Sequence, residues 1–344
     1  GWRQRAAALG LDAAALEALA GHTLMIDEPE PEVVFASLAG PDGICAGGSV
    51  FSRTEALTAL ASHPVPMRDG PDQPLLVGAA RLETMVDEFL QSPHVVQVTG
   101  TDEPLFSTRE MLSVQERVAT RFTKGLHQGA HLVADHHIDT ALSRHPHLTH
   151  EQRNLVERWC GDGHRHQAAV GRAGAGKTTT VAACADAWNE AGYRVMGAAV
   201  KGEAARTLAA ATGIDCETVA WYLAHDDPDQ YPIDARTVLV IDEASTLPDR
   251  DLDALMTMAA TTGASVRLIG DPAQHGAIAA GGMFRVLCER HPHVTPELQT
   301  THRVLDPDDR AAAQALREGR IDDALGHLEA AGHLHVVDDD LTMY

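Results

Sequence analysis

The chain has 344 residues, of which 44% are hydrophobic, so it is long enough for two or three domains and apolar enough to fill their cores. Its formal net charge of −22 excludes a protein that coats nucleic acid over its whole surface, although a narrow, locally basic channel remains compatible with it. The absence of a long apolar run and of a signal-peptide pattern, together with five scattered cysteines, predicts a cytoplasmic protein with no membrane partner.

The first part of the chain predicts two small units. Residues 1–20 have the amphipathic pattern of one helix, which we interpret as the remnant of a preceding domain. Residues 21–112 predict a small mixed α/β or helical module with helices around 53–62 and 80–90 and a strand at 94–100. Two helices followed by a β-ribbon favour a winged-helix-like module.

A helical linker is predicted next, over residues 113–147. The Ser-Thr-Arg-Glu stretch at 107–110 is a capping box that would open this helical segment. Clustered histidines follow, at His136, His137, His145 and His147, and then at His164 and His166. They lack the helical spacing and the carboxylate of a metal site, so we expect solvated loop histidines. The five cysteines are expected to be small buried residues.

From residue 148 the pattern becomes that of an α/β domain with a parallel sheet, because short apolar strands now alternate with helices. The predicted strands cover 167–171, 194–200, 237–242 and 265–271. Ligands of open α/β sheets bind beyond the carboxyl ends of the strands, so functional residues are expected there.

The strongest motif is a complete P-loop, Gly-Arg-Ala-Gly-Ala-Gly-Lys-Thr, at 171–178. Its glycines allow backbone conformations in which N–H groups point toward phosphate, and the helix that follows directs its positive end there. Lys177 would supply charge for the β- and γ-phosphates, and Thr178 would join the shell of Mg²⁺. The motif predicts an ATP–Mg²⁺ site formed by Gly171, Ala173, Gly174, Ala175, Gly176, Lys177, Thr178 and Thr179.

Two further strand ends carry polar residues suited to phosphoryl transfer. In Val-Leu-Val-Ile-Asp-Glu, Asp242 is placed to hold Mg²⁺ through water, and Glu243 is placed to polarise the attacking water. In Gly-Asp-Pro-Ala-Gln, Gln274 can sense the γ-phosphate and couple it to a DNA-contacting loop. Each motif alone would be limited evidence for phosphoryl transfer. Together, and in this order after the P-loop, they indicate it specifically.

This set of motifs resembles superfamily 1 helicases, most closely the RecD-like motor of conjugative relaxase-helicases of the MobF type, as in TraA-like and TrwC-like proteins. The resemblance implies a RecA-like P-loop NTPase domain over 148–344, the first of two motor domains. We expect a fragment that lacks the nicking head and the second motor domain and that does not unwind DNA alone. The matching stretches lie at 148–152, 171–180, 197–214, 240–247, 270–284 and 298–303.

The resemblance also assigns roles that the residues alone do not. Gln152 would read the adenine, Arg303 would touch the γ-phosphate, and the segment around Lys201 and Thr207 would contact single-stranded DNA. Without the resemblance, Gln152 could equally be an ordinary residue at the start of a helix, and Arg303 could be a surface arginine. His275 departs from the family pattern, which has leucine there. The implied catalytic set is Lys177, Asp242, Glu243, Gln274 and Arg303.

Partners implied by the resemblance are single-stranded DNA, bound weakly by this chain, and other domains of the longer protein. Three alternatives remain open at this point. The first is a RecD-like DNA repair helicase with the same motor. The second is a regulatory P-loop module that binds nucleotide without driving a motor. The third, a small-molecule kinase, would leave the Gly-Asp-Pro-Ala-Gln element unexplained.

Overall fold

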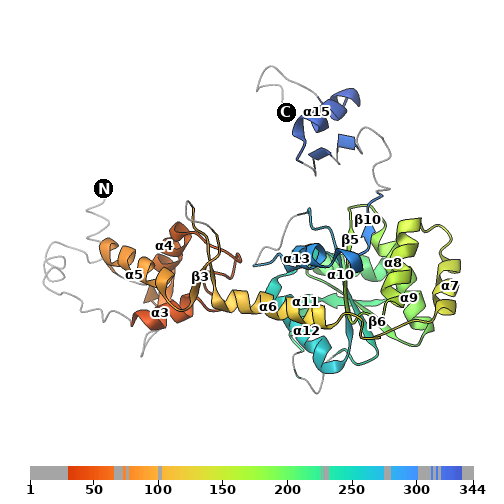
Figure 1. The fold of residues 1–344 in the computed structure, drawn as a ribbon, viewed down its shortest axis with the longest axis horizontal. Helices are drawn as coiled ribbons and strands as arrows, with labels where there is room; N and C mark the ends of the chain where they lie inside the picture. The colour runs from red at the N-terminus through yellow and green to blue at the C-terminus, as the bar shows by residue number, and fades with distance from the viewer. Residues whose placement is uncertain are drawn as a thin grey trace, which may run out of the picture. The chain divides into compact units, whose positions relative to one another are not determined.

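The computed structural model describes residues 30–65, 73–74, 77–99, 103–225, 227, 232–274, 280–300, 311–312, 315–316 and 319–334. The helix expected over residues 1–20 therefore lies outside the described residues. The chain divides into two compact units (Figure 1). Unit 1 comprises residues 1–45 and 50–109, and unit 2 comprises residues 46–49 and 110–344.

The described residues of unit 1 form three helices and short antiparallel strand pairs. Phe51 forms an isolated antiparallel bridge to Phe106, and the winged-helix-like module stays a prediction. Its core contains a tilted pair of aromatic rings, Phe35 and Phe89, with centroids 5.5 Å apart, and a stacked pair, Phe51 and Phe106, with centroids 6.1 Å apart. The elements are α3 (Pro31–Leu38), α4 (Arg53–Ser62), β1 (Pro64–Val65), β2 (Gln73–Pro74), α5 (Ala79–Gln91), β3 (Val95–Gln97) and β4 (Phe106–Thr108).

Helix α6 (Arg109–Lys124) buries one face, because Met111, Val114, Val118 and Phe122 recur at helical spacing. The helix that the predicted capping box at 107–110 would open begins at Arg109. Ser107 and Thr108 are residues of strand β4. The Glu110 carboxylate instead pairs with Arg250, whose Nη2 lies 2.6 Å from Glu110 Oε2.

Unit 2 is built on a six-stranded parallel sheet in the order β10-β5-β9-β8-β6-β7. The four predicted strands are present, and each differs from its predicted bounds by one residue at one end. Strands β7 and β10 were not predicted, because β7 is a polar edge strand and β10 has only two residues. The strands are β5 (His166–Gly171), β6 (Arg194–Ala199), β7 (Asp215–Thr218), β8 (Thr237–Ile241), β9 (Ser265–Gly270) and β10 (Glu297–Leu298).

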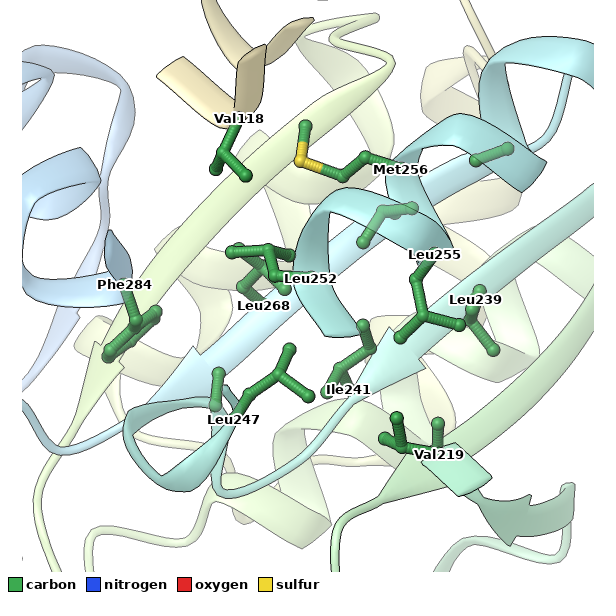
Figure 2. Close-up of a cluster of buried hydrophobic side chains, with 14 of the residues drawn as sticks. Val118, Val219, Leu239, Ile241, Leu247, Leu252, Leu255, Met256, Leu268 and Phe284 are labelled. Carbon is green, nitrogen blue, oxygen red and sulfur yellow. The ribbon is translucent and has the colours of Figure 1, made fainter. Parts of the chain in front are cut away.

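Helices cover both faces of this sheet and bury two apolar cores (Figure 1). One core joins the sheet to α6, α11, α12 and α13, and Figure 2 shows Leu239, Ile241 and Leu268 of the sheet among side chains from those helices. The other core joins it to α7, α8, α9 and α10. The helices and 3-10 turns are α7 (Asp135–Arg144), α8 (His150–Gly161), α9 (Lys177–Glu190), α10 (Gly202–Thr212), α11 (Val219–Leu223), η1 (Ala244–Thr246), α12 (Asp249–Thr262), α13 (Met283–Arg290), η2 (Pro292–Val294) and α15 (Ile321–Ala330).

Two of the clustered histidines do not lie in solvent, so that prediction is wrong for them. His164 and His166 are buried, and burial lowers the pKa of His166 to about 3. Both approach the amino ends of the strands, where the fully buried Arg267 donates hydrogen bonds to the carbonyls of Trp159 and Arg165. Burial of the cysteines is as expected for four of them, whereas Cys216 is half-buried, and none of the five, all of which lie among the described residues, forms a disulfide.

Helices in the described part of the chain are all too short or too polar to cross a membrane.

Candidate nucleotide-binding site

The P-loop connects the end of β5 to the start of α9. Gly174 and Gly176 have φ of 75° and 77°, the left-handed region that glycine enters without steric cost. Gly176 is the N-cap of α9, so the first free N–H groups of that helix lie beside the loop. This geometry provides the N–H donors and the positive helix end that phosphate requires.

Lys177 is the first residue of α9 and folds back over the loop. Its Nζ donates a hydrogen bond to the carbonyl of Gly171 at 3.1 Å. A Cβ at position 171 would lie 2.5 Å from Lys177 Cγ, so only glycine leaves space for the aliphatic stem at this point. The ammonium is thus held in the cavity described below.

The Asp-Glu pair follows β8 without a break. Asp242 is partly buried and its Oδ1 accepts a hydrogen bond from the amide of Glu243 at 2.8 Å. Glu243 has a φ of 52°, a strained conformation for a residue other than glycine, and such strain is concentrated at functional sites. Burial raises the pKa of Asp242 and outweighs the hydrogen bond from Glu243 and the charge of Lys177, which lower it. A bound cation would offset the cost of burying the negative charge of Asp242.

The Gly-Asp-Pro-Ala-Gln turn follows β9, the strand between β5 and β8. Asp271 is buried and organises the turn, because its Oδ1 accepts from the amide of Ala273 and its Oδ2 accepts from Gln274 Nε2, both at 3.1 Å. Close approach of this strand end to the Asp-Glu pair depends on Gly270, where a Cβ would lie 2.9 Å from the amide of Ser245. Gln274 is thereby oriented beside the acidic residues.

These strand ends enclose one cavity of about 560 Å³. It combines ammonium groups, hydroxyls and carboxylates, which are the groups that a nucleotide phosphate with Mg²⁺ needs. Lys201 and Thr207, which the resemblance assigned to DNA, line the same cavity. The lining is Ala173, Gly174, Gly176, Lys177, Thr178, Thr179, Lys201, Glu203, Ala204, Thr207, Asp242, Glu243, Ser245, Gly270, Asp271 and Gln274.

Gln152 lies beneath the P-loop, and its amide is engaged at both ends. Its Oε1 accepts from the amide of Thr149 at 2.9 Å, which completes a capping box at the start of α8. Its Nε2 donates to the carbonyl of Ala175 at 3.0 Å. The amide nitrogen has a second hydrogen and the oxygen a second lone pair, so the predicted contact with adenine does not require these two bonds to break.

Glu151, the neighbour of Gln152, was missed by sequence reasoning. Its carboxylate accepts hydrogen bonds from the backbone of Gln299 and Thr300, which follow β10. Burial raises the pKa of Glu151, but these bonds and that from the Thr300 hydroxyl outweigh it, so the pKa is lowered overall. Arg303 lies outside the described residues.

Replacing Asp242 with asparagine is expected to stabilise the nucleotide-free protein while abolishing its response to Mg²⁺. Because its pKa is raised in the folded state, ionised Asp242 lowers the free energy of unfolding. This destabilisation disappears as the pH falls through the raised pKa and the carboxyl group becomes neutral. We expect a melting temperature higher by about 2–4 °C at neutral pH, corresponding to roughly 1 kcal/mol, with the difference vanishing in acid. Thermal melts with and without ATP and Mg²⁺ measure both effects.

The matched control is Asp253→Asn. Asp253 is paired with Arg117 and Arg121, so the same chemical change should lower the melting temperature of the protein. A lower melting temperature for Asp242→Asn, or an undiminished stabilisation by ATP with Mg²⁺, would contradict the assigned role.

Comparison with known proteins places these features in a family. The family model described as "AAA domain" matches residues 147–339. The chain is 33% identical over 229 residues to the "Probable conjugal transfer protein TraA" of Sinorhizobium fredii, a match that covers 64% of this chain and 20% of that protein. It is 32% identical over 154 residues to the "ATP-dependent RecD2 DNA helicase" of Deinococcus radiodurans, covering 43% of this chain and 21% of that protein.

A solved arterivirus nonstructural protein 10 helicase in complex with DNA matches with a TM-score of 0.33 at 11% identity, covering 65% of this chain and 50% of that one. The chain spans about a fifth of the length of the curated relatives it matches. The sequence matches confirm the resemblance to TraA-type conjugation proteins and to RecD-like helicases that the motifs predicted.

Proposed function

The chain belongs to the AAA domain family, and from that premise we propose that it is the ATP-binding and ATP-hydrolysing motor domain of a superfamily 1 DNA helicase that acts in conjugative DNA transfer. The observation that carries the proposal is the cavity in which Lys177, Thr178, Asp242, Glu243 and Gln274 meet at the carboxyl ends of parallel strands. This position is where open α/β sheets bind their ligands.

In this proposal the P-loop residues 171–179 hold the phosphates of ATP. Lys177 pairs with the β- and γ-phosphates, and Thr178 and Asp242 hold Mg²⁺, directly or through water. Bound Mg²⁺ would neutralise charge on the phosphates and so favour attack at the γ-phosphorus. Gln152 stays assigned to the adenine and Arg303 to the γ-phosphate, both as proposals.

Hydrolysis requires a water molecule that is oriented and deprotonated. The Glu243 carboxylate accepts a proton from this water while the water oxygen forms a bond to the γ-phosphorus. The bond from the γ-phosphorus to the bridging oxygen breaks, and that oxygen leaves with ADP. Gln274, whose Nε2 donates to Asp271, would lie beside this water and would respond to whether the γ-phosphate is present.

A role in conjugation is favoured over one in repair by the extent of the matches. The match to the TraA protein covers 64% of this chain, against 43% for the RecD2 helicase. We propose that the chain acts in the cytoplasm, with single-stranded DNA and further domains of the same protein as its partners.

Weak, salt-sensitive binding of single-stranded DNA is the expected result of a direct test. Contacts between a few basic side chains and phosphates release counterions, so the logarithm of the association constant should fall with the logarithm of salt concentration with a slope of about −0.7 per contact. Fluorescence anisotropy of a labelled oligothymidylate over a salt series measures this slope. The same oligonucleotide should accelerate ATP hydrolysis.

Two controls belong to this experiment. Lys177→Ala reports on contaminating ATPases, and the same sequence annealed into a duplex reports on preference for single strands. Binding that is independent of salt, or hydrolysis that is indifferent to DNA, would contradict a DNA-coupled motor.

A further inference from the structure

Lys201 lines the same cavity as Lys177, but it enters from the end that lies away from the P-loop. The P-loop follows β5, whereas Lys201 follows β6, and strands β9 and β8 lie between these two in the sheet. Three strand spacings amount to about 14 Å. A ligand that fills the cavity from one end to the other would therefore lie between two ammonium groups.

The chain that leaves β6 begins beside the Asp-Glu pair. The amide of Asp242 donates to the carbonyl of Ala198 at 2.9 Å, so the ends of β8 and β6 are joined at this point. Lys201 follows Ala198 by three residues, and α10 begins directly after it. Ala204 and Thr207, which lie three and six residues further along, also line the cavity, so one face of this helix forms its wall.

Lysine is an unfavourable residue for the position that Lys201 occupies. It is the N-cap of α10, and its side chain makes no capping hydrogen bond. Short polar residues are preferred there because they accept from the first free N–H groups, and a cation is repelled by the positive end of the helix. A residue that breaks a local rule in this way is expected where function needs it. An anion between the ammonium and the start of the helix would offset the repulsion.

Positive charge is scarce in the cavity, so each ammonium group matters for binding a triphosphate. The described lining carries the ammonium groups of Lys177 and Lys201 and the carboxylates of Glu203, Asp242, Glu243 and Asp271. Lys177 Nζ already donates to the carbonyl of Gly171. Within the described part of the chain, the exposed ammonium of Lys201 has no hydrogen bond and no ion pair, although Glu203 is close in sequence. It is therefore available to a ligand.

We propose that Lys201 binds the γ-phosphate of ATP and thereby selects ATP over ADP. The P-loop amides hold the α- and β-phosphates, so the γ-phosphate extends from the loop toward Glu243 and the end of β6. A hydrogen bond from an ammonium to a phosphate oxygen is of the strong, charge-assisted kind. The inference rests on the proposed function, because it takes the cavity as an ATP site.

Single-stranded DNA offers the same phosphate chemistry, and the resemblance assigned Lys201 to it. The cavity favours the nucleotide, because Lys201 shares it with Lys177, Thr178 and Asp242. A plainer interpretation is an exposed lysine that contacts only water. The nucleotide role predicts a loss of selectivity for ATP when the ammonium is removed, the DNA role predicts a smaller salt slope, and the plain role predicts neither.

Protection of lysines from acylation distinguishes these ligands, because the chain has only three lysines and mass spectrometry reads each one separately. A non-hydrolysable ATP analogue with Mg²⁺, at about ten times its Kd, should slow modification of Lys201 roughly tenfold, since only the unbound fraction reacts. ADP with Mg²⁺ should leave Lys201 unprotected. Lys177 should be protected by both nucleotides, because it also pairs with the β-phosphate, and the exposed Lys124 by neither.

Calorimetric titration measures the selectivity itself. Lys201→Ala should weaken the ATP analogue by about tenfold and leave ADP unchanged, because it removes one charged hydrogen bond to the γ-phosphate. Lys201→Arg should keep most of the preference for ATP, since a guanidinium group also donates to phosphate. Lys124→Ala should bind both nucleotides like the wild type. In the salt series with oligothymidylate, Lys201→Ala should keep the wild-type slope.

Equal affinity of Lys201→Ala and wild type for the ATP analogue, or equal losses for the analogue and ADP, would overturn the proposal. Protection of Lys201 by oligothymidylate, with a salt slope that is smaller by about 0.7 in Lys201→Ala, would assign the lysine to DNA instead. If the analogue protects Lys177 but not Lys201, the proposal fails while the proposed function stands. If it protects neither lysine, the proposed function fails as well.

Discussion

Replacing Lys177 with alanine is expected to weaken the binding of ATP–Mg²⁺ by about a hundredfold or more, because truncating one partner of a desolvated charge pair costs roughly 2–5 kcal/mol. The P-loop amides remain in the variant, but the mobile positive charge that pairs with the phosphates is gone. The fold should persist, since Lys177 Nζ bonds only to a loop carbonyl among the described groups.

Calorimetric titration of ATP–Mg²⁺ measures the loss. The chain has three lysines, and Lys124 lies exposed on α6, so Lys124→Ala removes the same charge without touching the cavity. It should bind like the wild type. Equal affinity of Lys177→Ala and wild type would refute the assignment of the P-loop.

Replacing Glu243 with glutamine is expected to leave ATP bound but to slow hydrolysis by roughly 10²–10⁴-fold, the usual contribution of a positioned general base. Glutamine has the size of glutamate and can occupy the same left-handed backbone conformation, so the cavity should be preserved. It cannot accept the proton of the attacking water.

Single-turnover hydrolysis, with protein in excess over labelled ATP, separates this chemical step from product release. Glu217→Gln, at an exposed position of strand β7, controls for the loss of one negative charge. Wild-type rates in Glu243→Gln would show that another group activates the water. A parallel loss of ATP affinity would show that Glu243 holds nucleotide instead.

The P-loop and the two polar strand ends could be predicted from the sequence because their chemistry is local. Buried strands of five or six residues give recognisable apolar runs. Asp242 follows such a strand directly, and Lys177 and Gln274 lie in the short loops or helix starts just beyond the ends of two others. In a parallel sheet, all carboxyl ends point to one edge, so the meeting of these residues followed from the fold class alone.

Contacts between distant segments could not be predicted in this way. Glu151 and Thr300 are separated by 149 residues, and nothing near Glu151 indicates its partner. Capping boxes show the same limit. The Ser-Thr-Arg-Glu stretch at 107–110 has the pattern, yet Ser107 belongs to a strand, whereas Thr149 and Gln152 form a real box.

Burial of the histidines was also decided by tertiary packing. His166 begins strand β5, and Gly125, which follows α6, packs so closely on its ring that a Cβ there would lie 2.6 Å from the imidazole Cδ2. Polar composition alone suggested solvent, but His166 belongs to a strand of a parallel sheet that is covered on both faces, and the residues of such a strand are mostly buried.

The most direct test of the nucleotide site is a crystal structure of this chain with a non-hydrolysable ATP analogue and Mg²⁺. We predict that the triphosphate lies along the P-loop, with Lys177 Nζ on the β- and γ-phosphates and the metal between Thr178 and Asp242. Phosphates bound elsewhere, or a P-loop cavity that stays without ligand at saturating analogue, would contradict the account.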